Sequence, residues 1–177
     1  MTRKISIVAR KANNMQRVPD ARVDVEALIQ GGVDALTTLH ISLPGRPMRN
    51  GKPLEPEWPE DLSRCTSRKL GRLHGEYTAM AGYAESQLAL VDTRQLAAKH
   101  NEKMVLTLQE LRGTAKTVKG RAANALVSED AQSEATWHLR RVAEFKLIRA
   151  LLEDYIRKQK AVSREIARRD SLESRNT

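Results

Sequence analysis

The chain has 177 residues, an aromatic content of only 3% and a formal net charge of +9, with a sequence pI of about 10.0. This length allows one domain with an additional arm or tail, and so few aromatic residues argue against a large compact core. The basic balance favours a polyanionic partner, nucleic acid first and an anionic membrane surface second, over a basic surface that is merely solvated.

Cysteine content and hydropathy limit the cellular compartments that the sequence suggests. Cys65 is the single cysteine, so no internal disulfide can form and the chain suits a reducing cytoplasm. No apolar run reaches the roughly 18 residues needed to span a bilayer. The amino-terminal ISIVA is also too short for the core of a signal peptide. We therefore expect a cytoplasmic protein without a membrane partner.

Two segments precede the main helical region. Residues 1–19 form a basic arm, a feature of nucleic-acid contacts and equally of disordered termini. Residues 20–43 are predicted to form a short helical segment, capped by Asp20 and with apolar residues at helical spacing. Gly31 and Gly32 interrupt that face, so two shorter helical pieces are an alternative. The closing LHISLP suits a brief strand.

Residues 44–66 contain five prolines and two glycines. This composition predicts an extended linker without regular structure. Trp58 lies within the linker and is expected to dock onto the helices as an anchor. Base stacking is the alternative role for this side chain.

The region 67–170 begins with a long amphipathic stretch. Ser67 is its expected helix cap, and no proline follows Pro59, so nothing forces a break. Apolar residues recur at the spacing of one helical face, weaken between residues 92 and 103, and then resume. They are Leu70, Leu73, Tyr77, Met80, Ala84, Leu88, Val91, Val105, Leu108 and Leu111.

A second amphipathic stretch returns after the basic crossover GTAKTVKGRAANALV. Ser128 is its expected cap, and the two acids that follow it suit the positive end of a helix dipole. Its apolar face is predicted to comprise Trp137, Leu139, Val142, Phe145, Ile148, Leu152, Tyr155, Val162 and Ile166. Glu153 with Arg157, and Glu165 with Arg169, have the spacing of ion pairs within a helix.

Two amphipathic stretches joined by a short connection normally pack antiparallel. We therefore predict an all-α fold: a long, coiled-coil-like antiparallel helical hairpin, preceded by the short helix and the Pro-rich linker and followed by a tail at residues 171–177. Some apolar residues lie off the pairing stripe and would stay wet in a single hairpin, which predicts a homo-oligomer. They are Leu90, Leu96, Leu147 and Leu151.

Residues that would carry catalysis are sparse. The histidines, at positions 40, 74, 100 and 138, lack metal-ligand spacing and have no cysteine cluster beside them. No phosphate-cradling glycine loop, nucleophile elbow or paired-carboxylate signature is present. Gly71, Gly75 and Gly82 are better explained by close helix–helix approach than by a ligand. We expect no enzyme activity, no cofactor and no metal.

The crossover is the most informative polar stretch. Arg112, Lys116, Lys119 and Arg121 lie in a segment with no acid between Glu110 and Glu129. Its glycines suggest a mobile backbone, and Thr114 and Thr117 can donate to phosphate oxygens. Such a segment suits single-stranded nucleic acid, and an ordinary solvated hairpin tip is the alternative. Arg140 and Arg141 begin a second basic patch on the return stretch, where interspersed acids indicate a mostly solvated face.

The order LGRLHGEYTAMAGYAESQLAL, a basic turn and EFKLIRALLEDYIRKQKAVSREIARR resembles small helical proteins of tailed bacteriophages, and among them the UvsY-type recombination mediators. The resemblance covers roughly residues 67–169 and rests on helix order, the basic stretch and the LLEDY-type second arm. It implies a helical oligomer that binds single-stranded DNA and helps to load a recombinase in place of a single-strand-binding protein. The DNA contacts would fall on Arg112, Lys116, Lys119 and Arg121, while the family's nearby aromatic residues have no counterpart here.

Two functions from different classes follow. The first is a non-enzymatic accessory protein that binds single-stranded DNA as a helical oligomer, with a recombinase or a single-strand-binding protein as a further partner, in the host cytoplasm if the chain is phage-encoded. The alternative is a phage structural or assembly protein. Its hairpins would pack on partners, and residues 1–66 would wrap a neighbouring subunit.

Overall fold

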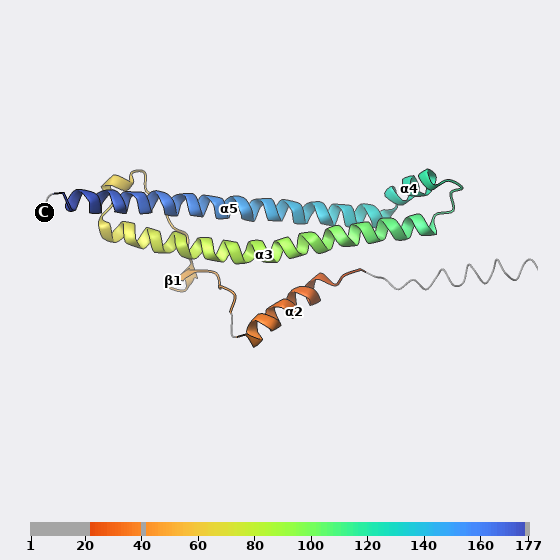
Figure 1. Ribbon diagram of the computed structural model, residues 1–177, viewed down its shortest axis with the longest axis horizontal. Helices are drawn as coiled ribbons and strands as arrows, with labels where there is room; N and C mark the ends of the chain where they lie inside the picture. The colour runs from red at the N-terminus through yellow and green to blue at the C-terminus, as the bar shows by residue number, and fades with distance from the viewer. Residues whose placement is uncertain (1–21, 40–41, 176–177) are drawn as a thin grey trace, which may run out of the picture. The chain divides into compact units, whose positions relative to one another are not determined.

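The computed structural model describes residues 22–39 and 42–175, and the fold within them is all-α, as predicted. The basic arm at residues 1–19, the predicted helix cap Asp20 and residues 40–41 of the LHISLP stretch lie outside these residues. The described residues 42–44 of that stretch are not in a strand. The elements, shown in Figure 1, are α2 (Val25–Thr38), β1 (Met48–Arg49), β2 (Lys52–Pro53), the 3-10 helix η1 (Leu62–Arg64), α3 (Ser67–Arg112), α4 (Val118–Leu126) and α5 (Glu129–Glu173).

Parts of both long helices contribute to each of two compact units. The first unit holds Thr93–Arg141 together with the described residues up to Ile29, and the second holds Gln30–Asp92 together with the described residues from Val142 onward. Each unit therefore contains a piece of α3 and a piece of α5.

The two long helices run antiparallel within each unit. In the first unit, Gln109 donates to Asp130 at 3.1 Å and Glu102 lies 2.7 Å from His138. The residue nearer the start of α3 thus contacts the residue farther along α5, as in an antiparallel pair. In the second unit the Gln159 amide donates to the Thr78 hydroxyl at 2.8 Å. The predicted antiparallel hairpin is confirmed.

The core of the second unit forms where the apolar stripes of α3 and α5 meet. Its fully buried large side chains are Leu70, Leu73, Tyr77 and Val162, and Cys65 joins them. Leu70, Leu73 and Tyr77 recur at three- and four-residue spacing, so one face of α3 supplies all three. Partly buried residues complete the cluster: Leu62, Tyr155 and Ile166.

The first long helix differs from prediction in two details. Its cap is Thr66 rather than Ser67, because the Thr66 hydroxyl accepts from the Lys69 amide at 3.2 Å. Across residues 92–103, where the apolar pattern weakens, the helix continues unbroken and buries Ala97, Ala98 and Asn101. Small side chains keep the helices packed there, although they contribute little to an apolar pattern.

The return helix starts at Glu129 as expected, with the Ser128 hydroxyl accepting from Ala131 at 3.3 Å. It ends at Glu173, three residues into the predicted tail. Leu139 and Trp137, predicted on its apolar face, are exposed, and so is Leu111 at the end of α3. Leu111 lies in the last turn of α3, and Trp137 borders an open hollow.

The four leucines predicted to lie off the pairing stripe differ in exposure. Leu96, Leu147 and Leu151 are exposed, as predicted, whereas Leu90 is half-buried. Glu165 pairs with Arg169 as predicted, but Glu153 pairs with Arg149 and not with Arg157. Arg157 turns instead to Asp154, three residues before it.

The Pro-rich segment contains regular structure, contrary to prediction. β1 and β2 form a two-stranded antiparallel hairpin in which Met48 pairs with Pro53 and Arg49 with Lys52. The turn residues Asn50 and Gly51 have φ values of 50° and 75°, the left-handed conformation that Asn-Gly turns adopt at low cost. The Asn-Gly pair in MRNGKP was therefore a hairpin signal within the Pro-rich stretch.

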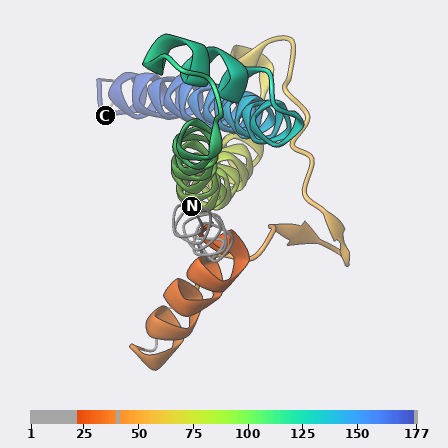
Figure 2. The same ribbon diagram turned by 90° about the vertical axis from the view of Figure 1, so that its right-hand side faces the viewer.

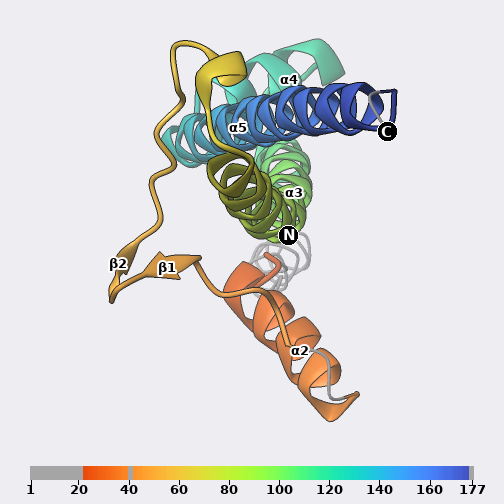
Figure 3. The same ribbon diagram turned by 90° about the vertical axis from the view of Figure 1, so that its left-hand side faces the viewer.

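The rest of this segment is tied to the helices of the second unit, as Figure 3 shows for its run past α5. Leu54 is buried, the Tyr77 hydroxyl donates to the Pro56 carbonyl at 3.3 Å, and the Trp58 ring packs edge-on against Tyr77 with centroids 5.7 Å apart. Docking of Trp58 is confirmed. A short strap rather than a free linker leads into α3.

The structure decides two questions about glycine. α2 runs unbroken through Gly31 and Gly32, so the predicted single helical segment is confirmed and the alternative of two pieces is excluded. Gly71, Gly75 and Gly82 do not mark a close helix approach, because a Cβ atom added at any of them would meet nothing within 4 Å. These three glycines lie on α3 away from its packed face.

Candidate nucleic-acid interface

The basic crossover is an ordered cap on the first unit rather than a mobile loop. We call residues 111–128 the tip: they comprise the end of α3, a turn, α4 and the two residues before α5. Figure 2 shows α4 and this turn at the near end of the two long helices. α4 is a nine-residue helix, so the predicted mobile segment is corrected to a helix–turn.

Local chemistry explains why α4 forms. Thr117 is its cap, and the Thr117 hydroxyl accepts from the Gly120 amide at 3.1 Å. A Cβ atom at Gly120 would lie 3.0 Å from that hydroxyl oxygen, so glycine leaves room for the cap. Ala125 is the buried residue that holds the helix to the unit.

Arg121 organises the turn and is only partly available to a ligand. Its guanidinium donates to the Ala115 carbonyl at 3.4 Å, and its side chain lies where a Cβ atom at Gly113 would approach to 3.0 Å. Glycine at position 113 thus leaves room for Arg121 to fold back over the turn without displacing its side chain. The half-buried Arg121 joins the ends of the turn. This structural role could not be recognised from the positions of basic residues in the sequence.

The other three predicted cations of the tip are exposed. Arg112, Lys116 and Lys119 point to solvent, and none forms an ion pair with any residue that the structure describes. Their charges are therefore not neutralised by the protein. From residue 22 onward the chain has 26 Lys and Arg against 21 Asp and Glu, and the tip supplies four of these cations and no acid. Most of the net positive charge of this part of the chain is concentrated in the tip.

Arg140 and Arg141 lie in the same unit but not in the tip. Arg140 lines a hollow with Asn101, which is 11 residues before Arg112 on α3, a separation of about 16 Å along the helix. The hollow, of about 580 Å³, has mixed charge. It is lined by Asn101, Glu129, Gln132, Ser133, Glu134, Thr136, Trp137 and Arg140. The structure therefore separates Arg140 and Arg141 from the other four predicted site residues.

Trp137, predicted on the apolar face of the return stretch, is a candidate contact for a ligand. It is 40% exposed, and the Arg141 guanidinium lies 4.0 Å from its ring centroid, in cation–π contact. Aromatic side chains stack with unpaired bases, so Trp137 provides an aromatic surface in the unit that bears the tip. The four-residue spacing from Trp137 to Arg141 was the available signal, since such residues share a helix face.

The basic run near the end of α5 is largely neutralised by neighbouring acids. Arg168 and Arg169 both donate to Glu165 at 2.8 Å, and their hydrogen bonds lower the pKa of that carboxyl to about 2. Lys158 and Arg157 likewise lower the pKa of Asp154, through hydrogen bonds first and charge second. These side chains form structural pairs, not a site for a polyanion.

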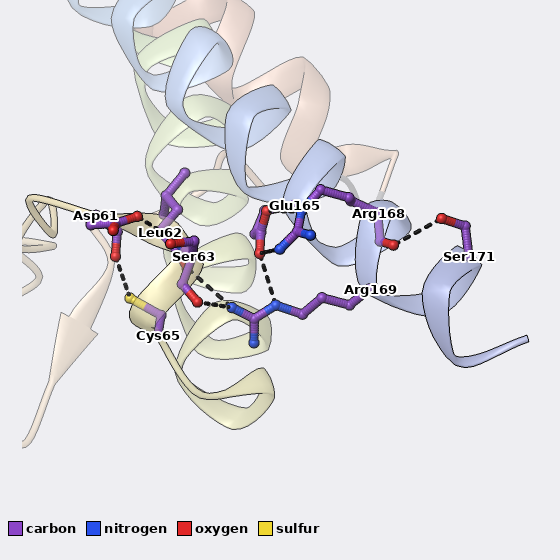
Figure 4. A network of polar contacts seen from close by, with 8 residues as sticks. All are labelled: Asp61, Leu62, Ser63, Cys65, Glu165, Arg168, Arg169 and Ser171. Atoms are coloured by element: carbon purple, nitrogen blue, oxygen red, sulfur yellow. Dashed lines mark hydrogen bonds and ion pairs between the residues drawn. The ribbon is translucent and has the colours of Figure 1, made fainter. Parts of the chain in front are cut away.

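Arg169 also ties the strap to α5. Its guanidinium donates to the carbonyl oxygens of Leu62 at 3.2 Å and Ser63 at 2.9 Å, while Glu165 holds it in place (Figure 4). The carbonyls at the end of η1 gain donors in this way. The basic charge at this position thus serves the fold of the second unit.

No group of three or more His, Cys, Asp or Glu residues in the described chain is arranged to hold a metal ion. Among the described helices, none combines the length and apolar content needed to cross a bilayer. Comparison of the chain with protein-family models, with curated proteins and with solved structures finds no match to any of them.

Proposed function

We propose that this protein is a non-enzymatic accessory protein that binds single-stranded nucleic acid, DNA foremost, through its tip. One observation carries the proposal: Arg112, Lys116 and Lys119 are exposed and unneutralised in a stretch of 18 residues without a single acid. Phosphate contacts by Lys and Arg supply most of the affinity of sequence-independent binding. The protein would organise a strand rather than make or break bonds.

Order in the tip supports this function. Because the end of α3, the turn and α4 order the backbone that carries the three cations, less backbone conformational entropy is lost on binding than from a mobile loop. The hydroxyl of Thr117 accepts a hydrogen bond from Gly120 and can still donate to a phosphate oxygen. The positive end of the α4 dipole lies at this same residue. The resemblance to the UvsY-type mediators is the reason for proposing single strands rather than duplex as the ligand. The same resemblance suggests a recombinase or single-strand-binding protein as partner, in a cytoplasmic setting.

The test is a salt series of fluorescence anisotropy with labelled single-stranded and double-stranded oligonucleotides. The combined variant Arg112→Ala, Lys116→Ala, Lys119→Ala should bind single strands more weakly at low salt. Its slope of log affinity against log salt should be shallower by about 2, at about 0.7 for each lost phosphate contact. Neither variant nor parent should show base preference.

A matched control removes the same charge elsewhere. Lys146, Lys160 and Arg164 are exposed cations of the second unit without an ion pair in the described residues. Their combined replacement by alanine should leave most of the affinity and slope intact. Equal losses in the two variants would show a diffuse effect of net charge, and unchanged binding by the tip variant would refute the site.

An assembly protein is the second candidate, and a specific observation favours it. Large apolar side chains are exposed on both long helices and at the tip, and α2 has no buried residue. Unmatched apolar surface of this kind is typical of protein–protein contact. Defined assemblies that bind oligonucleotides weakly, with no difference between single and double strands, would support this candidate over the first.

A further inference from the structure

The hollow beside Trp137 is a cavity of the first unit with a fixed wall. Its volume of about 580 Å³ lies within the roughly 300–1,000 Å³ typical of small-molecule sites. On the α3 side, Asn101 is only 6% exposed, and its amide is held by two hydrogen bonds to the Val23 backbone, at 2.8 Å and 3.1 Å. The α5 side is one helix face at three- and four-residue spacing, comprising Glu129, Gln132, Ser133, Thr136, Trp137 and Arg140.

Trp137 gives this wall an accessible aromatic surface. Its side chain is 40% exposed although it lines the hollow, and the Arg141 guanidinium lies 4.0 Å from the ring centroid. The cation–π contact restrains the ring without burying it. A planar ligand in the hollow can therefore stack on a ring whose orientation the protein already holds.

The polar groups of the hollow suit a nucleobase better than a phosphate. Glu129 and Glu134 place carboxylates on the wall, and Glu134 is paired with Arg22 at 3.1 Å. Carboxylates repel phosphate, but they accept hydrogen bonds from the N–H groups of bases. The amide and hydroxyl groups both donate and accept, so they can meet the edge of any base: Gln132, Ser133 and Thr136.

We propose that the hollow takes up one unpaired base of a single strand bound at the tip, with the base stacked on Trp137. Arg140, which forms no ion pair with any residue that the structure describes, then contacts a flanking phosphate. The hollow begins at Glu129, the residue after the tip, so both sites belong to one unit.

This base site deepens the proposed function and rests on it, because it gives a physical reason for preferring single strands. A base within a duplex is paired and stacked, and its extraction costs free energy. An unpaired base enters the hollow without that cost. Stacking is also tolerant of sequence, since every base has an aromatic face.

Tryptophan fluorescence tests whether a base reaches Trp137. The chain has two tryptophans, and Trp58→Phe leaves Trp137 as the single one while keeping an aromatic ring beside Tyr77. In this background, a single-stranded oligonucleotide should quench the emission of Trp137. An oligonucleotide of the same length without bases should bind through its phosphates and leave the emission unchanged. Equal emission changes with the two ligands would overturn the proposal.

Affinity provides an independent measurement. Trp137→Ala should weaken single-strand binding about fivefold or more and leave duplex binding unchanged. Its salt slope should match that of the parent, because no phosphate contact is lost. Trp137→Phe should retain most of the affinity, since a phenyl ring also stacks. Leu139→Ala is the matched control, because Leu139 is 67% exposed and does not line the hollow, and it should bind like the parent.

The results separate the base site from the tip. A shallower salt slope in the tip variant, with parent-like single-strand affinity in Trp137→Ala, would retain the proposed function and overturn the base site. Equal losses for single strands and duplex in Trp137→Ala would also overturn it, because a base pocket acts only on unpaired bases. A parent protein that binds no oligonucleotide would refute both.

Discussion

At the scale of single residues, burial separates the leucines that hold the fold from those that are available to partners. Leu73 is 2% exposed within the core of the second unit, whereas Leu147 on α5 is 67% exposed. Both belong to amphipathic stretches, and their hydrophobicity is identical. Only their position relative to the facing helix distinguishes them, so substitution should affect them very differently.

Replacement of Leu73 by alanine should lower the free energy of unfolding by about 2–5 kcal/mol, since it removes buried contacts and leaves a cavity. Leu147→Ala is the matched control and should change it by less than about 0.5 kcal/mol. Urea unfolding followed by circular dichroism measures both, at protein concentrations low enough to keep the oligomeric state the same. Similar losses in the two variants would mean that Leu147 is covered in solution.

At the scale of elements, α4 shows how a short helix depends on its cap. A nine-residue helix is marginal by itself, and Thr117 supplies the hydrogen bond to Gly120 that its first turn lacks. Lys119 and Arg121 lie on this helix, so the geometry of the candidate site depends on a neutral hydroxyl next to it.

Thr117→Ala should therefore destabilise α4 locally by about 1 kcal/mol, within a range of roughly 0.5–2 kcal/mol. Amide hydrogen exchange should be faster in residues 120–126, with little change in the long helices. Thr114→Ala is the control, because Thr114 is exposed and forms no hydrogen bond within the described residues. Unchanged exchange in the Thr117 variant would show that packing of Ala125 alone holds α4.

At the scale of the whole molecule, the carboxylates held by arginine and lysine determine how stability responds to acid. The pKa of Glu165 is about 2 in the folded chain against an ordinary value of 4.5. Between these values the unfolded chain takes up a proton that the folded chain refuses, so the stabilising contribution is complete above pH 4.5 and is lost as the pH falls toward 2. The lowered pKa of Asp154 acts in the same direction.

Glu165→Gln should flatten the decline in stability between about pH 4.5 and pH 2, because the titrating group is removed. Urea midpoints measured at several pH values in this range provide the comparison with the parent. Glu85→Gln is a suitable control, since Glu85 is exposed on α3 and has no ion-pair partner in the described chain. Equal flattening in both variants would assign the acid response to net charge rather than to the Arg168 and Arg169 contacts.

The sequence by itself determined the two long helices, their antiparallel pairing and the concentration of cations in the tip, because these follow from apolar periodicity, the Ser128 cap and a simple absence of acids. It also indicated the docking of Trp58. Only the tertiary structure decided which of the basic side chains make contacts within the fold and which are left free for a partner. Arg121 bridges the turn, Arg141 covers Trp137, and Arg169 holds the strap, although all three carry the same charge as the free Lys116. Periodicity records only what lies along one helix, whereas neutralisation and burial depend on groups brought close by folding.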